Sequence, residues 1–206
     1  MSVVPQTPFL FSGSMRLNLD PFAKQSDVHM WAALEAVQMK DHVQSLPGGL
    51  DAPVSEGGGN LSVGQRQLLC LARAVLQQSQ VLVMDEATAN IDQYTDSLIQ
   101  DVVRTSFKGK TVIMVAHRLN TVIDCDQVVV LSEGSVVEAG HPHLLLQAPA
   151  GTAAATAASL DGTAGIATAT ADATLSSMVE ETGPASSEHL RGLALEAWEA
   201  SERARG

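Results

Sequence analysis

Two adjacent acids, Asp85 and Glu86, directly follow an apolar run at residues 81–84. Such a run is typical of a buried strand, and ligands of open α/β sheets bind beyond the carboxyl ends of their strands. One carboxylate there can hold Mg²⁺, directly or through water, and its neighbour can act as general base on an attacking water. Asp85 is the candidate metal ligand and Glu86 the candidate catalytic base, although two acids after a strand are equally typical of a solvated turn.

A second candidate site precedes this strand. Ser62-Val-Gly-Gln65 has the Ser-x-x-Gln pattern of a capping box, in which two side chains satisfy free amides at a helix start. A helix N-terminus presents free N–H groups and a positive dipole end, which together suit an anion. Gly64 would let a phosphate approach the backbone closely. Most capping boxes are ordinary helix starts, so the anion-binding interpretation of this one depends on its position before the acidic pair.

Two further polar residues close apolar runs. Gln6 follows residues 1–4, and His117 follows residues 112–116. If both runs are strands of the same parallel sheet, we expect these side chains at the edge where Asp85 lies. The Gln6 amide could bind a metal ion or water there, and His117 could contact a terminal phosphate. The other five histidines are interpreted as structural or surface residues.

The elements that must position these residues follow from periodicity. Short runs rich in apolar and β-branched residues, typical of strands, occur at residues 81–84, 112–116, 128–131 and 135–138. Helical patterns occupy residues 27–39, a stretch starting near 62, residues 95–107 and residues 188–203. Apolar strands separated by helices predict a parallel sheet covered by helices on both faces. Asp27 is the expected N-cap of the first helix, with Val28 on its apolar face.

Composition narrows the function classes. Of 206 residues, 45% are hydrophobic and 3% aromatic, so we expect a sizeable aliphatic core. The net charge of −11 argues against nucleic acid as a main partner, because phosphates are bound by clustered Lys and Arg. No apolar run approaches the ~20 residues that span a bilayer. The two cysteines, without a secretory signal before them, are expected to be inert reduced thiols.

The composition changes at residue 148. Residues 148–174 contain 12 Ala and 6 Thr with almost no large apolar side chains, so they cannot bury enough surface to offset their ordering entropy. This stretch is predicted to be a disordered or weakly helical insertion. Helices are expected again from residue 175 to the end.

In order and spacing, these pieces resemble the nucleotide-binding domain of ATP-binding-cassette (ABC) transporters. Leu61-Ser-Val-Gly-Gln65 is similar to the signature motif, residues 81–86 to the Walker B strand and residues 89–92 to the D-loop. His117 resembles the switch histidine and Gln6 the Q-loop glutamine. The sequence of these motifs is most similar to the second cassette of the multidrug-resistance-associated (C) subfamily. The C-terminal segment from residue 175 resembles that of plant- and algal-type members.

The resemblance implies an α/β, P-loop NTPase-like fold with a helical subdomain. It divides the chain into a partial cassette at 1–147 with a helical subdomain at about 14–78, an insertion at 148–174 and C-terminal helices at 175–206. No Gly-x-x-x-x-Gly-Lys-[Ser/Thr] phosphate loop occurs, and Gly109-Lys-Thr111 precedes a strand and is interpreted as a turn. We therefore expect a cassette truncated at its N-terminus. Its remaining strands, 81–84 above all, should expose backbone groups of the β-ladder. The chain alone should bind ATP weakly and aggregate.

The resemblance also implies the chemistry. ATP and Mg²⁺ are the expected cofactors, and two cassettes pair head to tail around ATP. The residues expected to contact nucleotide are Ser62, Gly64 and Gln65 for the partner's ATP, Asp92 in the D-loop, and Gln6, Asp85, Glu86 and His117 for the cassette's own ATP. The other expected partners are membrane domains of the same transporter, which places the cassette at the cytosolic face of a vacuolar or plasma membrane. Export of organic anions, such as glutathione conjugates, is the implied function.

Two alternatives stay open at this point. The C-terminal lobe of an SMC-type chromosome ATPase also carries a signature and a Walker B strand without a phosphate loop. Residues 1–60 show no coiled-coil heptads and the chain is acidic, which disfavours that alternative. The other alternative is a non-catalytic partner that donates its signature face to another cassette.

Overall fold

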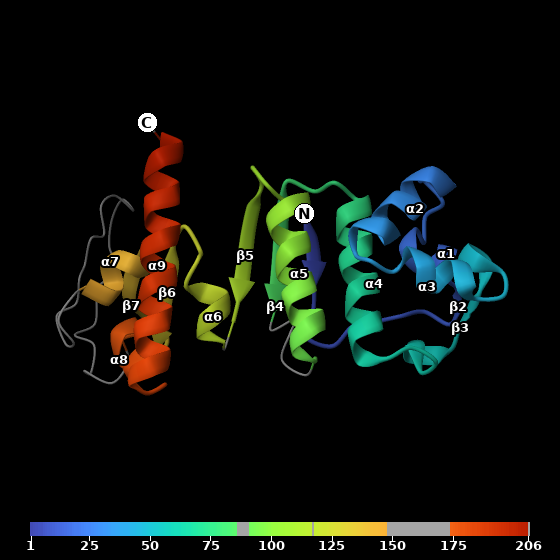
Figure 1. The fold of residues 1–206 in the computed structure, drawn as a ribbon. Coiled ribbons are helices and arrows are strands. Elements are labelled where there is room, and N and C mark those ends of the chain that lie inside the picture. The colour runs from blue at the N-terminus through green and yellow to red at the C-terminus, as the bar shows by residue number, and fades with distance from the viewer. Residues whose placement is uncertain (86–90, 117, 148–173, 206) are drawn as a thin grey trace. The chain divides into compact units, whose positions relative to one another are not determined.

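The computed structural model describes residues 1–85, 91–116, 118–147 and 174–205. These residues form two compact units, Met1–His117 and Arg118–Gly206, each with its own apolar core (Figure 1). The C-terminal helices pack within the second unit, and the predicted domain boundaries stay predictions. Almost all of the predicted insertion lies outside the described residues.

The first unit alternates short strands and helices. In chain order its elements are β1 (Ser2–Val4), β2 (Gly13–Ser14), α1 (Met15–Leu19), α2 (Asp27–Ala36), α3 (Lys40–Ser45), the 3₁₀ turn η1 (Gly49–Asp51), β3 (Pro53–Val54), the 3₁₀ turn η2 (Glu56–Gly58), α4 (Val63–Leu76), β4 (Val81–Asp85), α5 (Gln93–Ser106) and β5 (Thr111–Val115). β2 and β3 pair antiparallel beside the helices α1 to α3. The segment from β2 to α4 is thus mainly helical, and it covers the range expected for a helical subdomain.

The first unit has a three-stranded parallel sheet in the order β1-β4-β5. Val3 pairs with Val83, and Val83 with Ile113. β4 is bonded on both sides, so the expectation that residues 81–84 would expose their ladder groups is wrong. Because residues 1–4 already supply one neighbouring strand, β4 is the centre of the described sheet.

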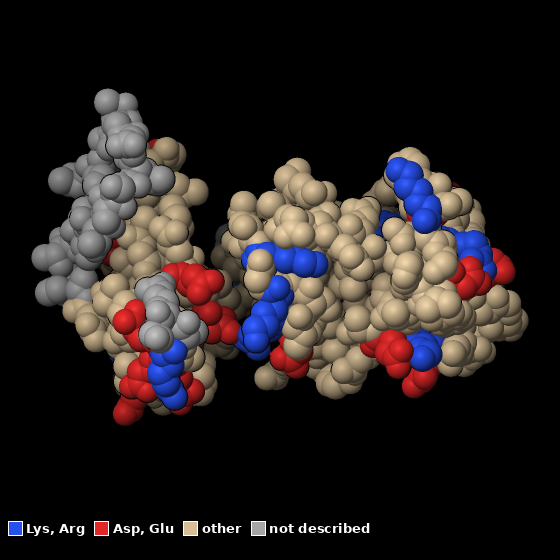
Figure 2. Space-filling model, turned by 90° about the horizontal axis from the view of Figure 1, so that it is seen from above, with Lys and Arg blue, Asp and Glu red and all other residues tan. Residues whose placement is uncertain are grey.

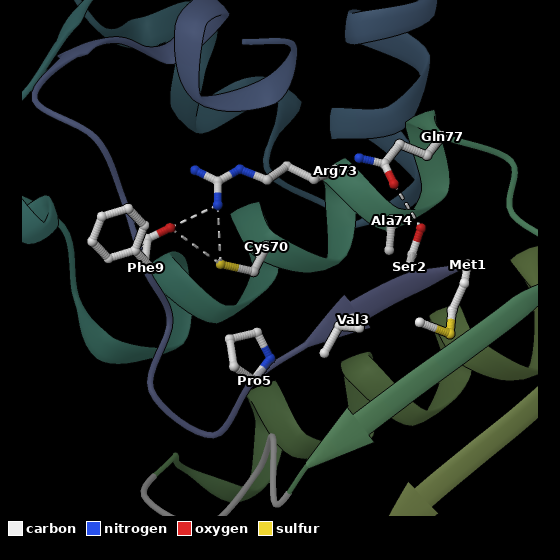
Figure 3. A pocket seen from close by; sticks show the side chains of 9 residues that line it. All are labelled: Met1, Ser2, Val3, Pro5, Phe9, Cys70, Arg73, Ala74 and Gln77. Atoms are coloured by element: carbon white, nitrogen blue, oxygen red, sulfur yellow. Dashed lines mark hydrogen bonds between the residues drawn. The ribbon is translucent and has the colours of Figure 1, made fainter. Parts of the chain in front are cut away.

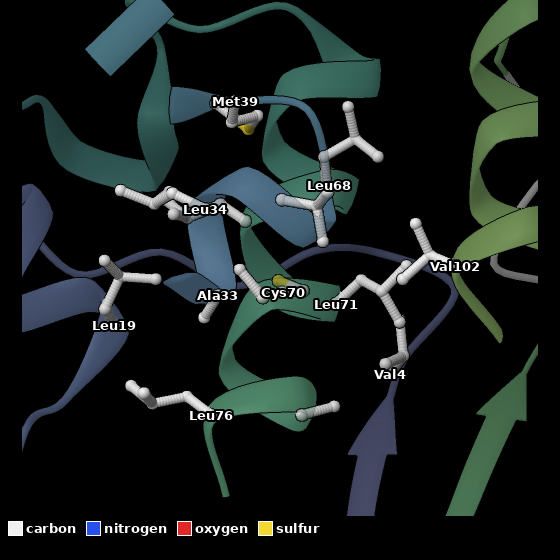
Figure 4. Packing of buried hydrophobic residues seen from close by; sticks show 14 of the residues in the cluster. Val4, Leu19, Ala33, Leu34, Met39, Leu68, Cys70, Leu71, Leu76 and Val102 are labelled. Atoms are coloured by element: carbon white, nitrogen blue, oxygen red, sulfur yellow. The ribbon is translucent and has the colours of Figure 1, made fainter. Parts of the chain in front are cut away.

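The helices α4 and α5 cover one face of this sheet. Leu71 of α4 points towards Val4 of β1 and Val102 of α5, and Leu34 of α2 lies on the other side of α4 (Figure 4). Leu71 is fully buried, which stabilises the fold by roughly 1.5–3 kcal/mol.

The opposite face of the sheet carries exposed apolar side chains. Val3, Ile113 and Val115 point to it, and each is at least half exposed, at 54%, 53% and 50%. Strand side chains alternate between faces, so these residues lie opposite the face that packs on α4 and α5. Exposed apolar surface of this kind favours association with other proteins.

The start of α2 corrects a local prediction. Its N-cap is Ser26, whose hydroxyl accepts from the His29 amide, and the expected cap Asp27 is the first helical residue. Val28, placed on the apolar face from periodicity, is 75% exposed. Serine caps at least as well as aspartate, and a one-residue shift rotates the buried face by about 100°.

The second unit contains α6 (Leu119–Val122), β6 (Val128–Ser132), β7 (Ser135–Gly140), α7 (Pro142–Gln147), α8 (Leu175–Glu180) and α9 (Pro184–Arg205). β6 and β7 form an antiparallel hairpin, so the prediction that residues 128–131 and 135–138 belong to the parallel sheet is wrong. Glu133 and Gly134 between them both have positive φ, as two-residue hairpin turns require. The buried Glu138 carboxylate accepts from the Leu175 amide at 2.8 Å and ties the start of α8 to β7.

Two sequence interpretations are confirmed by these elements. Residues 107–110 form a turn and Thr111 opens β5, so Gly109-Lys-Thr111 is not a phosphate loop. Cys70 and Cys125 are both free thiols. Within the described part of the chain, no helix combines the length and hydropathy that a bilayer span needs.

Candidate functional site: one edge of the parallel sheet

The carboxyl ends of three strands meet at one edge of the sheet in the first unit. β1 ends at Val4, β4 at Asp85 and β5 at Val115, and the parallel register brings these ends together. α4 and α5 run in the opposite direction, so their first turns lie at the same edge, the lower one in Figure 1. The structure therefore gathers strand ends and helix N-termini on one side, as ligand sites in α/β sheets require.

Asp85 and Gln6 are the described members of the predicted metal site. Asp85 is the last residue of β4, and Gln6 lies two residues beyond the end of β1. Both side chains are exposed, so their oxygens can reach a solvated ion. Glu86 and His117, the predicted base and switch histidine, lie outside the described residues.

The predicted capping box at the start of α4 is confirmed. Ser62 Oγ accepts from the Gln65 amide at 3.1 Å, and Gln65 Oε1 accepts from the Ser62 amide at 2.9 Å. Ser62 is exposed, and neighbouring Val63 is 43% exposed. The first turn of α4 is therefore open to a partner.

The side-chain amide of Gln65, which is predicted to contact nucleotide, already has two hydrogen-bond partners in the fold. Its Oε1 is used by the cap, and its Nε2 lies 3.2 Å from Nε2 of His42 in α3. A nucleotide contact through this amide would use its second N–H or replace His42. Nothing in the sequence links residues 42 and 65, which meet only through the packing of α3 on α4.

Gly64 is buried, and its missing side chain leaves room for Thr95 of α5. A Cβ at this position would lie 3.0 Å from Thr95 Cγ2 and 3.1 Å from Thr95 Oγ1. Sequence reasoning assigned this glycine to close approach of a phosphate, and that role stays a prediction. In the fold, Gly64 also lets α4 and α5 meet.

We expect Gly64→Ala to lower the free energy of unfolding by about 1 kcal/mol, because an overpacking cost of about 1–3 kcal/mol exceeds about 1 kcal/mol gained in helix propensity. Denaturant unfolding followed by circular dichroism measures this. Gly192→Ala in α9 is the matched control, since a Cβ there meets nothing within 4 Å. That control should stabilise the protein. Equal stabilisation by both variants would contradict the packing argument.

Asp92, the expected D-loop aspartate, is the N-cap of α5. Its Oδ1 accepts from the Thr95 amide at 3.0 Å and its Oδ2 from the Thr95 hydroxyl at 2.8 Å. These hydrogen bonds, the backbone one first, lower the pKa of Asp92 below its ordinary value. The carboxylate therefore stays charged at neutral pH, and the stability it lends α5 is lost only as the pH falls through that lowered pKa.

The described donors suit Mg²⁺. Asp85 and Gln6 offer exposed oxygen ligands at one edge, and carboxylate and amide oxygens are what this hard cation prefers. Two protein ligands are typical of Mg²⁺ sites that also use substrate phosphates and water. No cluster of three or more His, Cys, Asp or Glu side chains that could hold a metal ion alone occurs among the described residues.

The charge on one face of the described residues bears on nucleic acid as a ligand. On the face shown in Figure 2, basic side chains stand in small separate groups, several of them beside acidic side chains. A nucleic-acid footprint would instead need a continuous basic stripe. The acidic net charge of −11 points the same way.

The comparisons with known proteins agree with this geometry. The family model described as ABC transporter matches residues 1–89. A solved structure of a bacterial Atm1-family ABC exporter with ATP bound is similar over 70% of this chain and 26% of that chain, with a TM-score of 0.65 and 32% identity. The fold is that of an ABC-type cassette, and the chain belongs to the ABC transporter family.

The relatives narrow this class to subfamily C, which includes proteins of the multidrug-resistance-associated type. A probable multidrug resistance-associated protein of Drosophila melanogaster is 56% identical over 146 residues, 71% of this chain and 11% of its own length. ATP-binding cassette sub-family C member 4 of Homo sapiens is 52% identical over 71% of this chain and 11% of its own length. ABC transporter C family member 3 of Dictyostelium discoideum is 45% identical over 94% of this chain and 12% of its own length, so that match extends into the C-terminal helices. The chain spans about a tenth of the length of these relatives.

Proposed function

We propose that this chain is part of an ATP-hydrolysing cassette of an exporter that couples hydrolysis to transmembrane transport of organic anions or conjugates. The observation that carries the proposal is the shared edge, where the strand end at Asp85 and the exposed, capped start of α4 at Ser62 lie together. One named relative is an ABC transporter and the similar solved structure is an ABC exporter, which favours this function over the chromosome-ATPase alternative.

Each predicted residue then has one task. Asp85 and Gln6 hold Mg²⁺, which neutralises charge on the phosphates of ATP when it is bound. Glu86 takes the proton of the attacking water, and His117 contacts the terminal phosphate. Hydrogen-bond donors that the fold already holds in place stabilise the negative charge that develops on the transferring phosphoryl group.

Ser62 and Gly64 serve the other half of the pair. An exposed helix start with free N–H groups and a positive dipole end suits the phosphates of ATP held by a second cassette, paired head to tail. Asp92 holds the start of α5 beside it and so keeps the two helix N-termini in register. Membrane domains of the same transporter, at the cytosolic face of a vacuolar or plasma membrane, would receive the resulting motion.

Hydrolysis by mixed cassettes tests this proposal. We expect this chain alone to hydrolyse ATP at background rate, because its sequence contains no phosphate loop to hold the β- and γ-phosphates. Addition of an intact first cassette of the same subfamily should restore Mg²⁺-dependent hydrolysis above that of the added cassette alone. Hydrolysis that responds to DNA and not to the added cassette would favour the chromosome-ATPase alternative. An ordinary rate from this chain alone would contradict the assignment of the site.

A further inference from the structure

The segment at residues 5–12, which contains Gln6, has neither helix nor strand structure. Backbone N–H and C=O groups need partners wherever they are shielded from water. Here side chains from α1 and α4 supply them. Gln67 Nε2 donates to the Pro5 carbonyl at 3.2 Å, and Arg73 Nη1 donates to the Phe9 carbonyl at 2.7 Å. The conformation of this segment is therefore set largely by residues distant in sequence.

Arg73 is the centre of this network. Its Nη1 reaches the Phe9 carbonyl and lies 3.7 Å from Cys70 Sγ, as Figure 3 shows. Its Nε donates to the Asn18 carbonyl, and its Nη2 donates to Asn18 Oδ1 at 2.8 Å. Burial lowers the pKa of this guanidinium, which still bonds to several oxygens as a charged fork. One side chain thus joins α4, α1 and the segment.

Asn18 completes the clamp from α1. It is fully buried, and its amide pairs with the peptide of Phe11 through two hydrogen bonds of 2.9 Å each. Its Nδ2 also donates to the Ser14 carbonyl at 3.0 Å. With Arg73 on its Oδ1, every donor and acceptor of the side chain is used. A fully satisfied buried network of this kind fixes a single geometry.

The contact between β1 and the last turns of α4 is looser. A cavity of about 280 Å³ lies there, lined by Ser2, Pro5, Phe9, Cys70, Arg73 and Gln77 among others (Figure 3). This pocket is open to solvent, so one side of the contact between α4 and β1 is not covered by other side chains. The segment is tied to α4 at the edge of this pocket.

We infer that Arg73, Asn18 and Gln67 are positioning residues that hold the segment at residues 5–12 on α4, so that Gln6 follows the position of that helix. α4 is a rod of 14 residues, about 21 Å long, and Ser62 caps its other end. The inference rests on the proposed function, in which Ser62 contacts one nucleotide and Gln6 another. Contact of Ser62 with the partner's nucleotide then sets where Gln6 stands at its own site.

The first test needs no nucleotide. Thiol labelling of the purified full chain, read by peptide mass spectrometry, follows Cys70 and Cys125 separately, and Cys125 is the internal reference. Cys70 is 4% exposed, and burial raises the pKa of its thiol, so it should label slowly while the clamp holds. We expect Arg73→Met to speed Cys70 labelling about ten- to a hundredfold, as loss of one or two hydrogen bonds to a charged group implies, with Cys125 unchanged.

Arg66→Met is the matched control, because Arg66 lies on the same helix but donates to the carbonyls of Gly58 and Leu61. It should leave Cys70 labelling unchanged, and Arg73→Lys should give an intermediate rate. An unchanged Cys70 rate in Arg73→Met overturns the inference. Parallel acceleration of both cysteines also overturns it, because that pattern reports loosening of the whole protein.

The second test addresses coupling, with the chain joined in frame to the phosphate-loop segment of a subfamily C cassette, so that its own site is complete, and paired with an intact first cassette. We expect Arg73→Met to lower kcat for ATP hydrolysis about tenfold with little change in KM, and Arg73→Lys to restore part of kcat, because Gln6 acts on metal and water during the reaction. A rise in KM alone contradicts the coupling. If the unsubstituted pair does not hydrolyse ATP, the proposed function fails, and the labelling result still decides whether the clamp exists.

Discussion

In this chain joined in frame to the phosphate-loop segment of a subfamily C cassette, which completes the site that Glu86 serves, Glu86→Gln should lower ATP hydrolysis by the paired cassettes about 10²–10⁴-fold, the contribution of a positioned general base. Glutamine keeps the size and the hydrogen-bonding oxygen of glutamate but cannot accept the water proton at neutral pH. ATP binding should persist, since Asp85 and Gln6 still offer their oxygens to Mg²⁺. A phosphate-release assay of the joined chain with an intact first cassette, together with binding of a fluorescent ATP analogue, separates the two effects.

The matched control is Glu188→Gln, which removes the same charge from an exposed position on α9. It should change neither hydrolysis nor binding. If Glu86→Gln retains more than about a tenth of the rate, the base must be sought elsewhere on the shared edge. If it abolishes ATP binding as well, Glu86 contributes to the affinity for the metal–nucleotide complex.

The positions of the strand ends were predictable because apolar runs stop where polar residues begin. Asp85 closes β4, residues 1–4 contain β1, and residues 112–116 overlap β5 to within one residue at each end, so the sheet edge follows from the pattern of residues alone. The hairpin of β6 and β7 was missed, although a signal was present. Only three residues separate the runs at 128–131 and 135–138, whereas a parallel crossover needs about a dozen.

Side-chain partners across the fold were harder to predict. The contact of Gly64 with Thr95 and that of Gln65 with His42 join residues far apart in sequence, and no periodic pattern reports them. Arg73 carried a weak signal, since a charged residue within an apolar helix stretch must find partners when it is buried. Those partners are the carbonyls of an irregular segment, and only the structure identifies them.

A second large loss of ATP hydrolysis is expected from a substitution at the N-terminus of α4. Ser62→Arg should lower hydrolysis by the paired cassettes at least about 100-fold, the effect of losing a preorganised donor to the reacting phosphate. The long side chain would occupy the exposed surface in front of the first turn, and its positive charge would oppose the helix dipole. The loss should fall on ATP held by the partner, so ATP binding by the partner cassette is the second readout.

Loss of a helix cap alone costs about 0.5–2 kcal/mol of stability and could imitate a functional effect. Ser26→Arg in α2 controls for this, because Ser26 is an exposed serine N-cap whose hydroxyl also accepts from the third helical amide. Both variants should lose similar stability in denaturant unfolding, and only Ser62→Arg should lose hydrolysis. An equal loss of hydrolysis in both would mean that α4 is an ordinary capped helix and that the anion site lies elsewhere on this edge.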